Sequence, residues 1–121
     1  MPTSDDTRTV IQTYFSRLKD KTGWEELLSD QMTFTSFTSP VKRAAGRAQY
    51  LEATRRFYST IGGFEVRDLL VDGDRACALT RYDIRPPAGP AFTSDVAEVF
   101  TVREDKITTF DIYFDSAPFP K

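Results

Sequence analysis

Residues 95–115 restrict the fold more than any other stretch of the chain, because they contain two strand-like runs joined by a short polar segment. Asp95–Val102 and Ile107–Asp115 are rich in Val, Ile, Phe, Tyr and Thr, the residues favoured in β-strands. The pattern predicts an antiparallel hairpin that turns at residues 103–106. Side chains alternate across a strand, so one face of this hairpin carries Val96, Glu98, Phe100, Val102, Phe110, Ile112 and Phe114.

Glu98 is the only charged residue on that apolar face. A carboxylate in such a position costs free energy unless it is paired, hydrogen-bonded or used. Two interpretations stay open from the residues alone. Glu98 is either a pocket acid, base or ligand anchor whose pKa is raised by apolar neighbours, or one half of a structural ion pair with Arg81 or another cation.

The cysteine and histidine content excludes several kinds of chemistry. The chain has one Cys and no His, so an intrachain disulfide, a Ser-His-Asp triad and a zinc thiolate cluster are all impossible within it. The carboxylates are scattered, which argues against a calcium or magnesium site. We therefore expect no metal and no cofactor, and any acid–base group must be Asp, Glu, Tyr, Lys or the backbone.

Charge and hydropathy favour an ordinary globular protein. Sixteen basic and eighteen acidic residues give a net charge of −2, and no basic stripe supports nucleic-acid binding. No stretch reaches the roughly 20 apolar residues that span a bilayer. The first residues lack the charge and apolar core of a signal peptide. These features predict a cytoplasmic protein that binds neither nucleic acid nor membrane.

The first half of the chain is predicted to be mainly helical. Apolar residues recur at helical spacing from Val10 to Leu18, and Thr22 and Glu25 have the spacing of a capping box that would start a second, shorter helix. A strand is expected at 32–37, a loop at 38–46 and a third helix at 47–60. The second half then supplies strands at 64–71, 75–84 and 91–102 before the last strand of the hairpin.

This order predicts one α+β domain over residues 1–121, with a curved, mostly antiparallel sheet wrapped on about three N-terminal helices. Such a cone-shaped barrel leaves a cavity against the concave face of the sheet. Six apolar residues are expected to be core residues that also line the pocket wherever they border the cavity: Phe34, Phe57, Phe100, Phe110, Ile112 and Phe114.

The chain resembles the nuclear transport factor 2-like superfamily, and within it the SnoaL-like proteins, which include polyketide cyclases and relatives of ketosteroid isomerase. The resemblance is carried by Trp24–Phe34, by Gly46-Arg47 at the start of the third helix, by Val71–Leu79 and by Val99–Asp115. It covers about residues 11–115. It implies a cone-shaped α+β barrel, a pocket between sheet and helices, and commonly a homodimer through the sheet, with Tyr113 on the outward face.

The same resemblance suggests roles for individual residues. Tyr14 falls where ketosteroid isomerase has its oxyanion-hole tyrosine, and Glu98 falls where it has a protonated aspartate. Ser36 occupies the position of that enzyme's aspartate base, which leaves it as a polar group at the pocket mouth. The residues themselves favour the alternative that Tyr14 is an amphipathic core residue with its hydroxyl at the surface.

The resemblance also implies that the strand face that carries Leu79, Arg81 and Asp83 points toward the pocket. Arg81 would then bind a substrate carboxylate or enolate, or simply neutralise Glu98 or Asp83.

Two functional hypotheses follow. The first is an enzyme without cofactor that isomerises, cyclises or dehydrates an apolar carbonyl compound, with Glu98 as the acid–base group and Arg81 and Tyr14 stabilising oxyanion charge. The second is a non-catalytic or dimerisation module whose pocket holds a small apolar or acidic metabolite. Whether the protein is an enzyme stays open. The tail at residues 116–121 is expected to fold over the pocket mouth or to reach a partner subunit.

Overall fold

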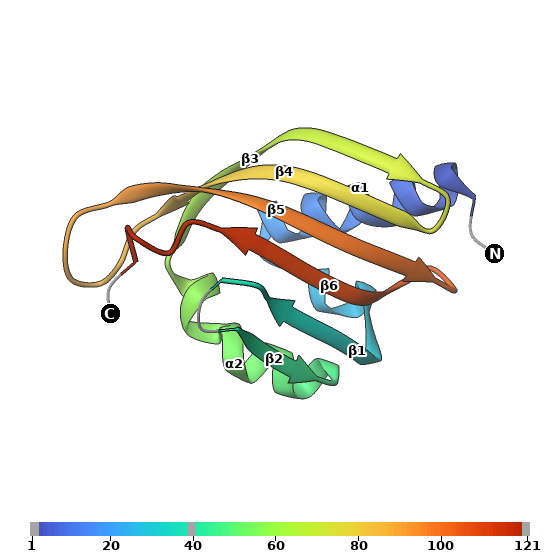
Figure 1. Cartoon of the computed structure of the whole chain (residues 1–121), viewed down its shortest axis with the longest axis horizontal. Helices are drawn as coiled ribbons and strands as arrows, with labels where there is room; N and C mark the ends of the chain where they lie inside the picture. The colour runs from blue at the N-terminus through green and yellow to red at the C-terminus, as the bar shows by residue number, and fades with distance from the viewer. Residues whose placement is uncertain (1–2, 39–40, 120–121) are drawn as a thin grey trace.

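The structure is a computed structural model that describes residues 3–38 and 41–119. One six-stranded sheet, ordered β2-β1-β6-β5-β4-β3, carries two α-helices and one short 3₁₀-helix (Figure 1). The elements in chain order are α1 (Ser4–Asp20), η1 (Trp24–Leu27), β1 (Leu28–Ser36), β2 (Lys42–Ala45), α2 (Arg47–Ser59), β3 (Ile61–Asp72), β4 (Arg75–Ile84), β5 (Phe92–Arg103) and β6 (Lys106–Phe114).

The sheet is mixed, curved and open. β1 pairs with β6 in parallel, and the other neighbours are antiparallel. Register shifts interrupt the pairing of β3 with β4 at two points, and bulges of this kind bend and twist a sheet. The predicted α+β class and mostly antiparallel sheet are confirmed. The predicted cone-shaped barrel takes the form of a curved sheet that does not close, because β2 and β3 are its two edges.

The helix α1 forms where the apolar spacing predicted it. Thr3 caps it by accepting a hydrogen bond from the Asp6 backbone N–H, while the Thr3 N–H donates to the Asp6 side chain. Lys21 ends it in the left-handed conformation, with φ of 61°. The predicted apolar face is buried: Val10, Ile11, Tyr14, Phe15 and Leu18.

The second of the three expected helices is only the 3₁₀ turn η1. The predicted capping box does not form, because the N-terminal capping position is Gly23, whose φ is 76° and which has no side chain to cap with. Instead, Arg17 donates to the Gly23 carbonyl and pairs with Glu26. Leu28, directly after this turn, is fully buried at the start of β1 opposite Ile107. The sequence prediction of about three helices is therefore corrected to two.

The first strand and the loop after it also differ from the sequence prediction. β1 starts at Leu28 rather than residue 32, and β2 occupies part of the segment expected to be loop. β2 is four residues long and pairs with the end of β1, where Ala44 lies opposite Phe34 and Lys42 opposite Ser36. This short edge strand brings Lys42 and Ala44 to the pocket that residues of α2 also line.

The hairpin of β5 and β6 has the predicted faces and the predicted turn. Glu104 and Asp105 adopt positive φ angles of 53° and 62°, the combination that reverses two twisted strands within two residues. Glu98 lies opposite Ile112 on β6 and Ala78 on β4. Phe100 is completely buried beneath α1, where its ring contacts those of Tyr14 and Phe15.

The face assignment of β4 was wrong in the sequence analysis. Ala76, Ala78, Thr80, Tyr82 and Ile84 are the buried residues, so they form the inner face. The predicted pocket residues of odd number, Leu79, Arg81 and Asp83, consequently point to the outer face. The reason is the cross-strand register: Ala78 is the residue opposite Glu98, and side chains alternate from there.

Replacing Phe100 by Ala tests the main core. The ring is fully buried between α1 and the sheet, so we expect Phe100→Ala to lower the free energy of unfolding by about 3–5 kcal/mol. Urea denaturation followed by circular dichroism measures it. The control is Leu70→Ala, a side chain that is 56% exposed, for which a loss below about 1 kcal/mol is expected. Equal losses in the two variants would contradict this description of the core.

Candidate functional site

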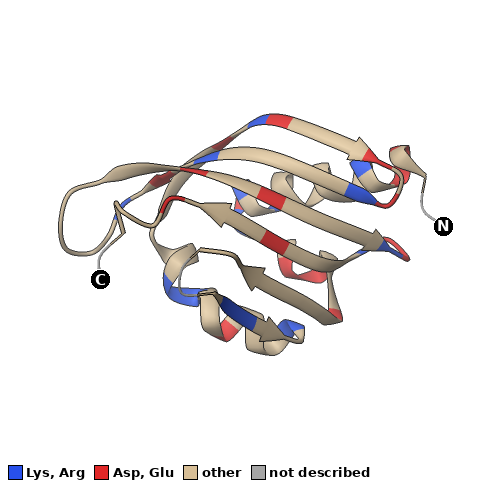
Figure 2. Ribbon diagram, viewed as in Figure 1, with Lys and Arg blue, Asp and Glu red and all other residues tan. Residues whose placement is uncertain are grey.

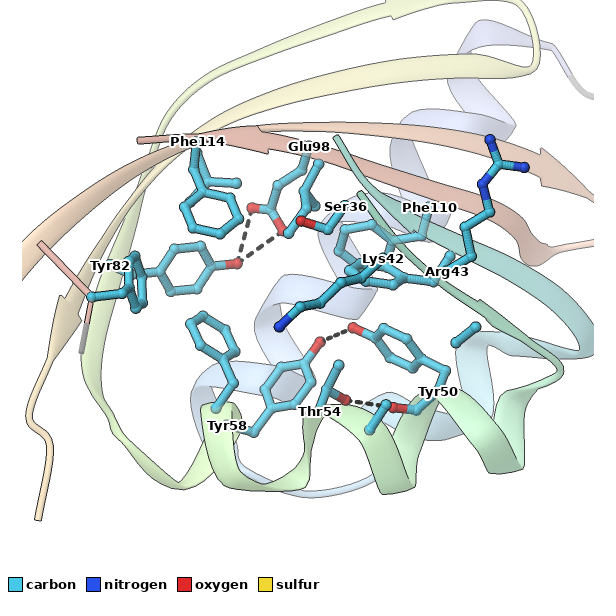
Figure 3. A pocket seen from close by; sticks show the side chains of 17 residues that line it. Ser36, Lys42, Arg43, Tyr50, Thr54, Tyr58, Tyr82, Glu98, Phe110 and Phe114 are labelled. Atoms are coloured by element: carbon cyan, nitrogen blue, oxygen red, sulfur yellow. Dashed lines mark hydrogen bonds between the residues drawn. The ribbon is translucent and has the colours of Figure 1, made fainter. Parts of the chain in front are cut away.

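A pocket of about 260 Å³ lies between the concave face of the sheet and α2 (Figure 3). β1, β6, β5 and β4 form one wall, α2 forms the other, and β2 and the segment after β6 lie at its rim. Most of its surface is aromatic or aliphatic. The lining residues are Phe34, Ser36, Lys42, Arg43, Ala44, Tyr50, Ala53, Thr54, Phe57, Tyr58, Tyr82, Val96, Glu98, Phe110, Ile112, Phe114 and Phe119.

Glu98 is the only acidic residue among those that line the pocket. It is 2% exposed, and the Tyr82 hydroxyl lies 2.9 Å from its Oε1 and 3.0 Å from its Oε2. Within residues 3–38 and 41–119, no Lys or Arg forms an ion pair with it. A neutral phenol thus takes the place that a cation would occupy in a structural ion pair.

The environment of Glu98 disfavours its charge. Burial raises the pKa of the Glu98 carboxyl from 4.5 to about 7, and the nearby Thr80 and Tyr82 hydroxyls lower it by less. Tyr82 is the donor with hydrogen-bonding geometry. Thr80 Oγ1 is buried and has no partner at hydrogen-bonding distance and angle in the part of the chain described, so it acts as a nearby dipole. A carboxyl with this pKa exchanges its proton readily near neutral pH.

Three tyrosines form a hydrogen-bonded chain beneath the pocket. The Tyr58 hydroxyl lies 3.1 Å from that of Tyr14 on α1 and also contacts that of Tyr50, about two turns away on the same face of α2. Tyr50 and Tyr58 line the pocket, whereas Tyr14 lies behind them and is fully buried. Burial raises the pKa of all three phenols well above the usual value, so they stay protonated and able to donate.

Many of the residues predicted from the sequence do meet at this pocket. Glu98 and Ser36 are there, and Ser36 is only 8% exposed. The apolar residues brought to the wall are Phe34, Phe57, Phe110, Ile112 and Phe114. Phe119, from the tail expected near the mouth, also lines it and contacts Phe92 and Phe114. Pro120 lies outside the described residues.

The other predicted site residues lie elsewhere. Arg81 pairs with Asp95, 2.9 Å away on the outer face of the sheet, so the expected contact between Arg81 and Glu98 is wrong. Asp83 pairs with Arg85, and Leu79 is 42% exposed on the same outer face. Phe100 is a core residue under α1 and does not reach the pocket.

Sequence reasoning missed Tyr82, and an available signal would have found it. Arg75, Arg81 and Asp83 all have odd numbers on β4, and charged residues normally occupy the solvent face of a half-buried strand. That alternation alone places Tyr82 inside. Tyr50, Thr54 and Lys42 carried no comparable signal, because their positions depend on how α2 and β2 dock on the sheet.

Within residues 3–38 and 41–119, no three His, Cys, Asp or Glu side chains gather in a way that would hold a metal ion. None of the described helices is both long enough and apolar enough to cross a membrane. Charged residues of both signs are spread over helices and strands (Figure 2).

Solved structures resemble this chain over nearly all its length. A proposed SnoaL-like polyketide cyclase from Jannaschia sp. CCS1 is 14% identical, with a TM-score of 0.80 over 95% of this chain and 89% of that one. A proposed ketosteroid isomerase from Kribbella flavida is 20% identical, with a TM-score of 0.76 over 98% and 84%. An NTF2-like protein of unknown function from Mesorhizobium loti is 20% identical, with a TM-score of 0.76 over 93% of each chain. At these identities the likeness shows the fold alone.

Sequence comparison identifies the family. No curated protein matches the chain significantly. The sequence model of the SnoaL-like domain matches residues 11–110, which run from the buried face of α1 to the Phe110 that lines the pocket. The chain therefore belongs to the SnoaL-like domain family.

Proposed function

We propose that the pocket binds a small apolar carbonyl compound and that Glu98 transfers a proton within it. The observation that carries the proposal is a single carboxyl, buried in an apolar pocket with no cation beside it, whose pKa is raised to about 7. Isomerisation, cyclisation and dehydration of carbonyl compounds all begin with proton transfer at carbon, which the side chains of the chain can perform without a cofactor. The names of the Jannaschia and Kribbella structures are consistent with this class of chemistry.

Glu98 would act first as a base and then as an acid. Near neutral pH a substantial share of the molecules carries the carboxylate, which accepts a proton from the carbon next to the carbonyl. The protonated acid then returns that proton to another carbon or to a leaving oxygen. Tyr82 donates to both carboxyl oxygens and so fixes the orientation of the group in either state.

The tyrosines of α2 would stabilise the negative charge that forms on the substrate oxygen. Tyr50 and Tyr58 line the wall opposite the sheet, and both phenols keep their protons. Tyr14 would act through Tyr58, as a positioning residue that polarises its hydroxyl. Arg81 has no part in this mechanism, because it lies on the outer face of the sheet.

The alternative is a pocket that binds without converting its ligand. Ser36 favours this alternative. It occupies the position of the carboxylate base in the related isomerase, and a serine hydroxyl cannot accept a proton from carbon. Under this hypothesis Glu98 in its neutral form donates a hydrogen bond to a ligand carbonyl. Both hypotheses use the same pocket, and they differ in whether hydrogen at the ligand's α-carbon exchanges with solvent.

Replacing Glu98 tests the proton transfer. The assay is exchange of α-hydrogen for deuterium in a panel of small cyclic ketones and enones, followed by NMR in deuterated buffer. We expect Glu98→Gln to slow the catalysed exchange by about 100-fold or more, the usual contribution of a general base. Asp111→Asn is the matched control, since Asp111 lies opposite Val99 on the outer face. Binding of a panel member without exchange by the wild-type protein would favour the alternative.

A second test of Glu98 needs no substrate. The folded state binds the Glu98 proton more tightly than the unfolded chain does, so this group's contribution to stability is fully present below about pH 4.5 and is lost as the pH rises through about 7. Between about pH 5 and pH 8, the free energy of unfolding of the wild-type protein should fall by about 2–3 kcal/mol relative to that of Glu98→Gln. Urea titrations across this range measure it. A difference that stays constant with pH would contradict the raised pKa.

The outer face of the sheet would join two copies of the chain. Leu79, Ala97 and Tyr113 form one cross-strand row there, and Leu79 and Tyr113 are 42% and 49% exposed. The ring of Phe37 stacks on Tyr113 with centroids 4.9 Å apart, which widens the apolar surface.

Light scattering after size-exclusion chromatography tests this homodimer. We expect the wild-type protein to have the mass of a dimer and Tyr113→Glu to have that of a monomer, because the new carboxylate would be buried without a partner. Gln12→Glu, on the exposed side of α1, adds the same charge away from the sheet and should remain dimeric. A monomeric wild-type protein would refute the assignment.

A further inference from the structure

A row of side chains crosses the inner face of the sheet from the pocket mouth to Glu98. Lys42 on β2 pairs with Ser36 on β1, Ser36 with Ile112 on β6, and Ile112 with Glu98 on β5. Four residues on four neighbouring strands therefore share one face at one level. Three strand spacings of about 4.8 Å separate the ends of the row, and the concave curvature brings their side chains closer than their backbones.

Lys42 belongs to the pocket and not to the outer surface. Its neighbour two residues on, Ala44, is 5% exposed and lines the same pocket. Figure 3 shows Lys42 reaching from β2 across the front of the pocket toward α2, whereas Arg43 points away. As a residue Lys42 is exposed, so its ammonium lies at the mouth in contact with water.

The ammonium of Lys42 has no anionic partner within residues 3–38 and 41–119. Arg43, the other basic residue that borders the pocket, lies opposite Thr35 on the outer face. Burial raises the pKa of Asp111 on that face, and Arg75 and Arg43 oppose part of the rise. Lys42 is thus the cation of the inner face. The pocket has an acid at its deep end, a free cation at its mouth and an apolar wall between them.

We propose that the ligand is an amphipathic monocarboxylic acid whose carboxylate binds Lys42 at the pocket mouth while its apolar body lies against the aromatic wall near Glu98. This inference rests on the proposed function only in taking the pocket as the site of a small apolar molecule. The opposite orientation would place a second carboxylate beside Glu98, where desolvation and like-charge repulsion both oppose it. At the mouth the carboxylate keeps part of its hydration and gains the ammonium.

This orientation also explains how one pocket would bind a ligand with a carboxylate although the pocket itself contains the buried carboxyl of Glu98. The charge of the ligand stays with Lys42, and the uncharged part of its skeleton, where a carbonyl would react, reaches Glu98 and Tyr82. Ser36 lies between the two ends and offers a hydroxyl to a polar atom of the ligand.

Two probes of nearly equal shape test the charge preference: 2-naphthoate and its neutral amide, 2-naphthamide. We expect the wild-type protein to bind the carboxylate roughly fivefold more tightly than the amide in calorimetric titrations at low salt, the effect of one ion pair at a partly exposed site. Lys42→Met keeps an unbranched side chain of nearly the same length and removes the charge, so the preference should fall to about one. Lys42→Arg should retain it, and added salt should weaken it in the wild-type protein.

Lys19→Met is the matched control, because it makes the same substitution at an exposed lysine on α1 that does not line this pocket. It should leave the preference unchanged. The inference is overturned if Lys42→Met retains the preference, if Lys19→Met abolishes it, or if the wild-type protein binds the two probes equally or binds neither at millimolar concentration. Naphthoate has no α-hydrogen to exchange, so a charge preference without ketone exchange would leave this inference standing and refute proton transfer by Glu98.

Discussion

The hydrogen bonds from Tyr82 to Glu98 depend on the register between β4 and β5. That register places Ala78 opposite Glu98, and the small side chain leaves room for the carboxyl, while Tyr82 reaches it from further along β4. A shift by one residue would turn Arg81 inward and Tyr82 outward. The same register also affects the pKa of Glu98. The neutral phenol of Tyr82 beside the carboxyl permits a raised pKa, whereas a guanidinium in that place would have lowered it.

The sequence was a reliable guide where one strong periodicity acted within one element. The apolar spacing of α1 predicted its buried face, and the alternation in residues 95–115 predicted both the hairpin and the inward direction of Glu98. These patterns succeed because they reflect burial on one side of a single element. The predicted inner face of β4 was wrong because it rested on the family resemblance, whereas the alternation of charged residues within β4 itself indicates the opposite face. Its odd-numbered face carries Arg75, Arg81 and Asp83, and it is the exposed face.

Other parts of the site depend on docking between distant segments and left no pattern in the sequence. β2 has four residues and exists because the end of β1 offers it a partner. The tyrosine chain joins α1 to α2, and its hydroxyls meet only after both helices pack on the sheet. Short edge strands and contacts between helices depend on tertiary packing. Lys42 and Tyr50 therefore could not be assigned to the pocket from local composition.

Burial of Glu98 opposes stability and raises the pKa of its carboxyl for the same physical reason. The apolar wall that removes water from the carboxyl makes its charged form costly, so the folded protein loses stability as the group ionises. A core built only for stability would place an apolar residue opposite Ala78. The large aromatic cluster around Phe100 lies under α1 and supplies stability that offsets this cost. It reaches the pocket wall through Phe110, whose ring centroid lies 4.5 Å from that of Phe100. One continuous core thus stabilises the sheet and also supplies the apolar surroundings that raise the pKa of Glu98.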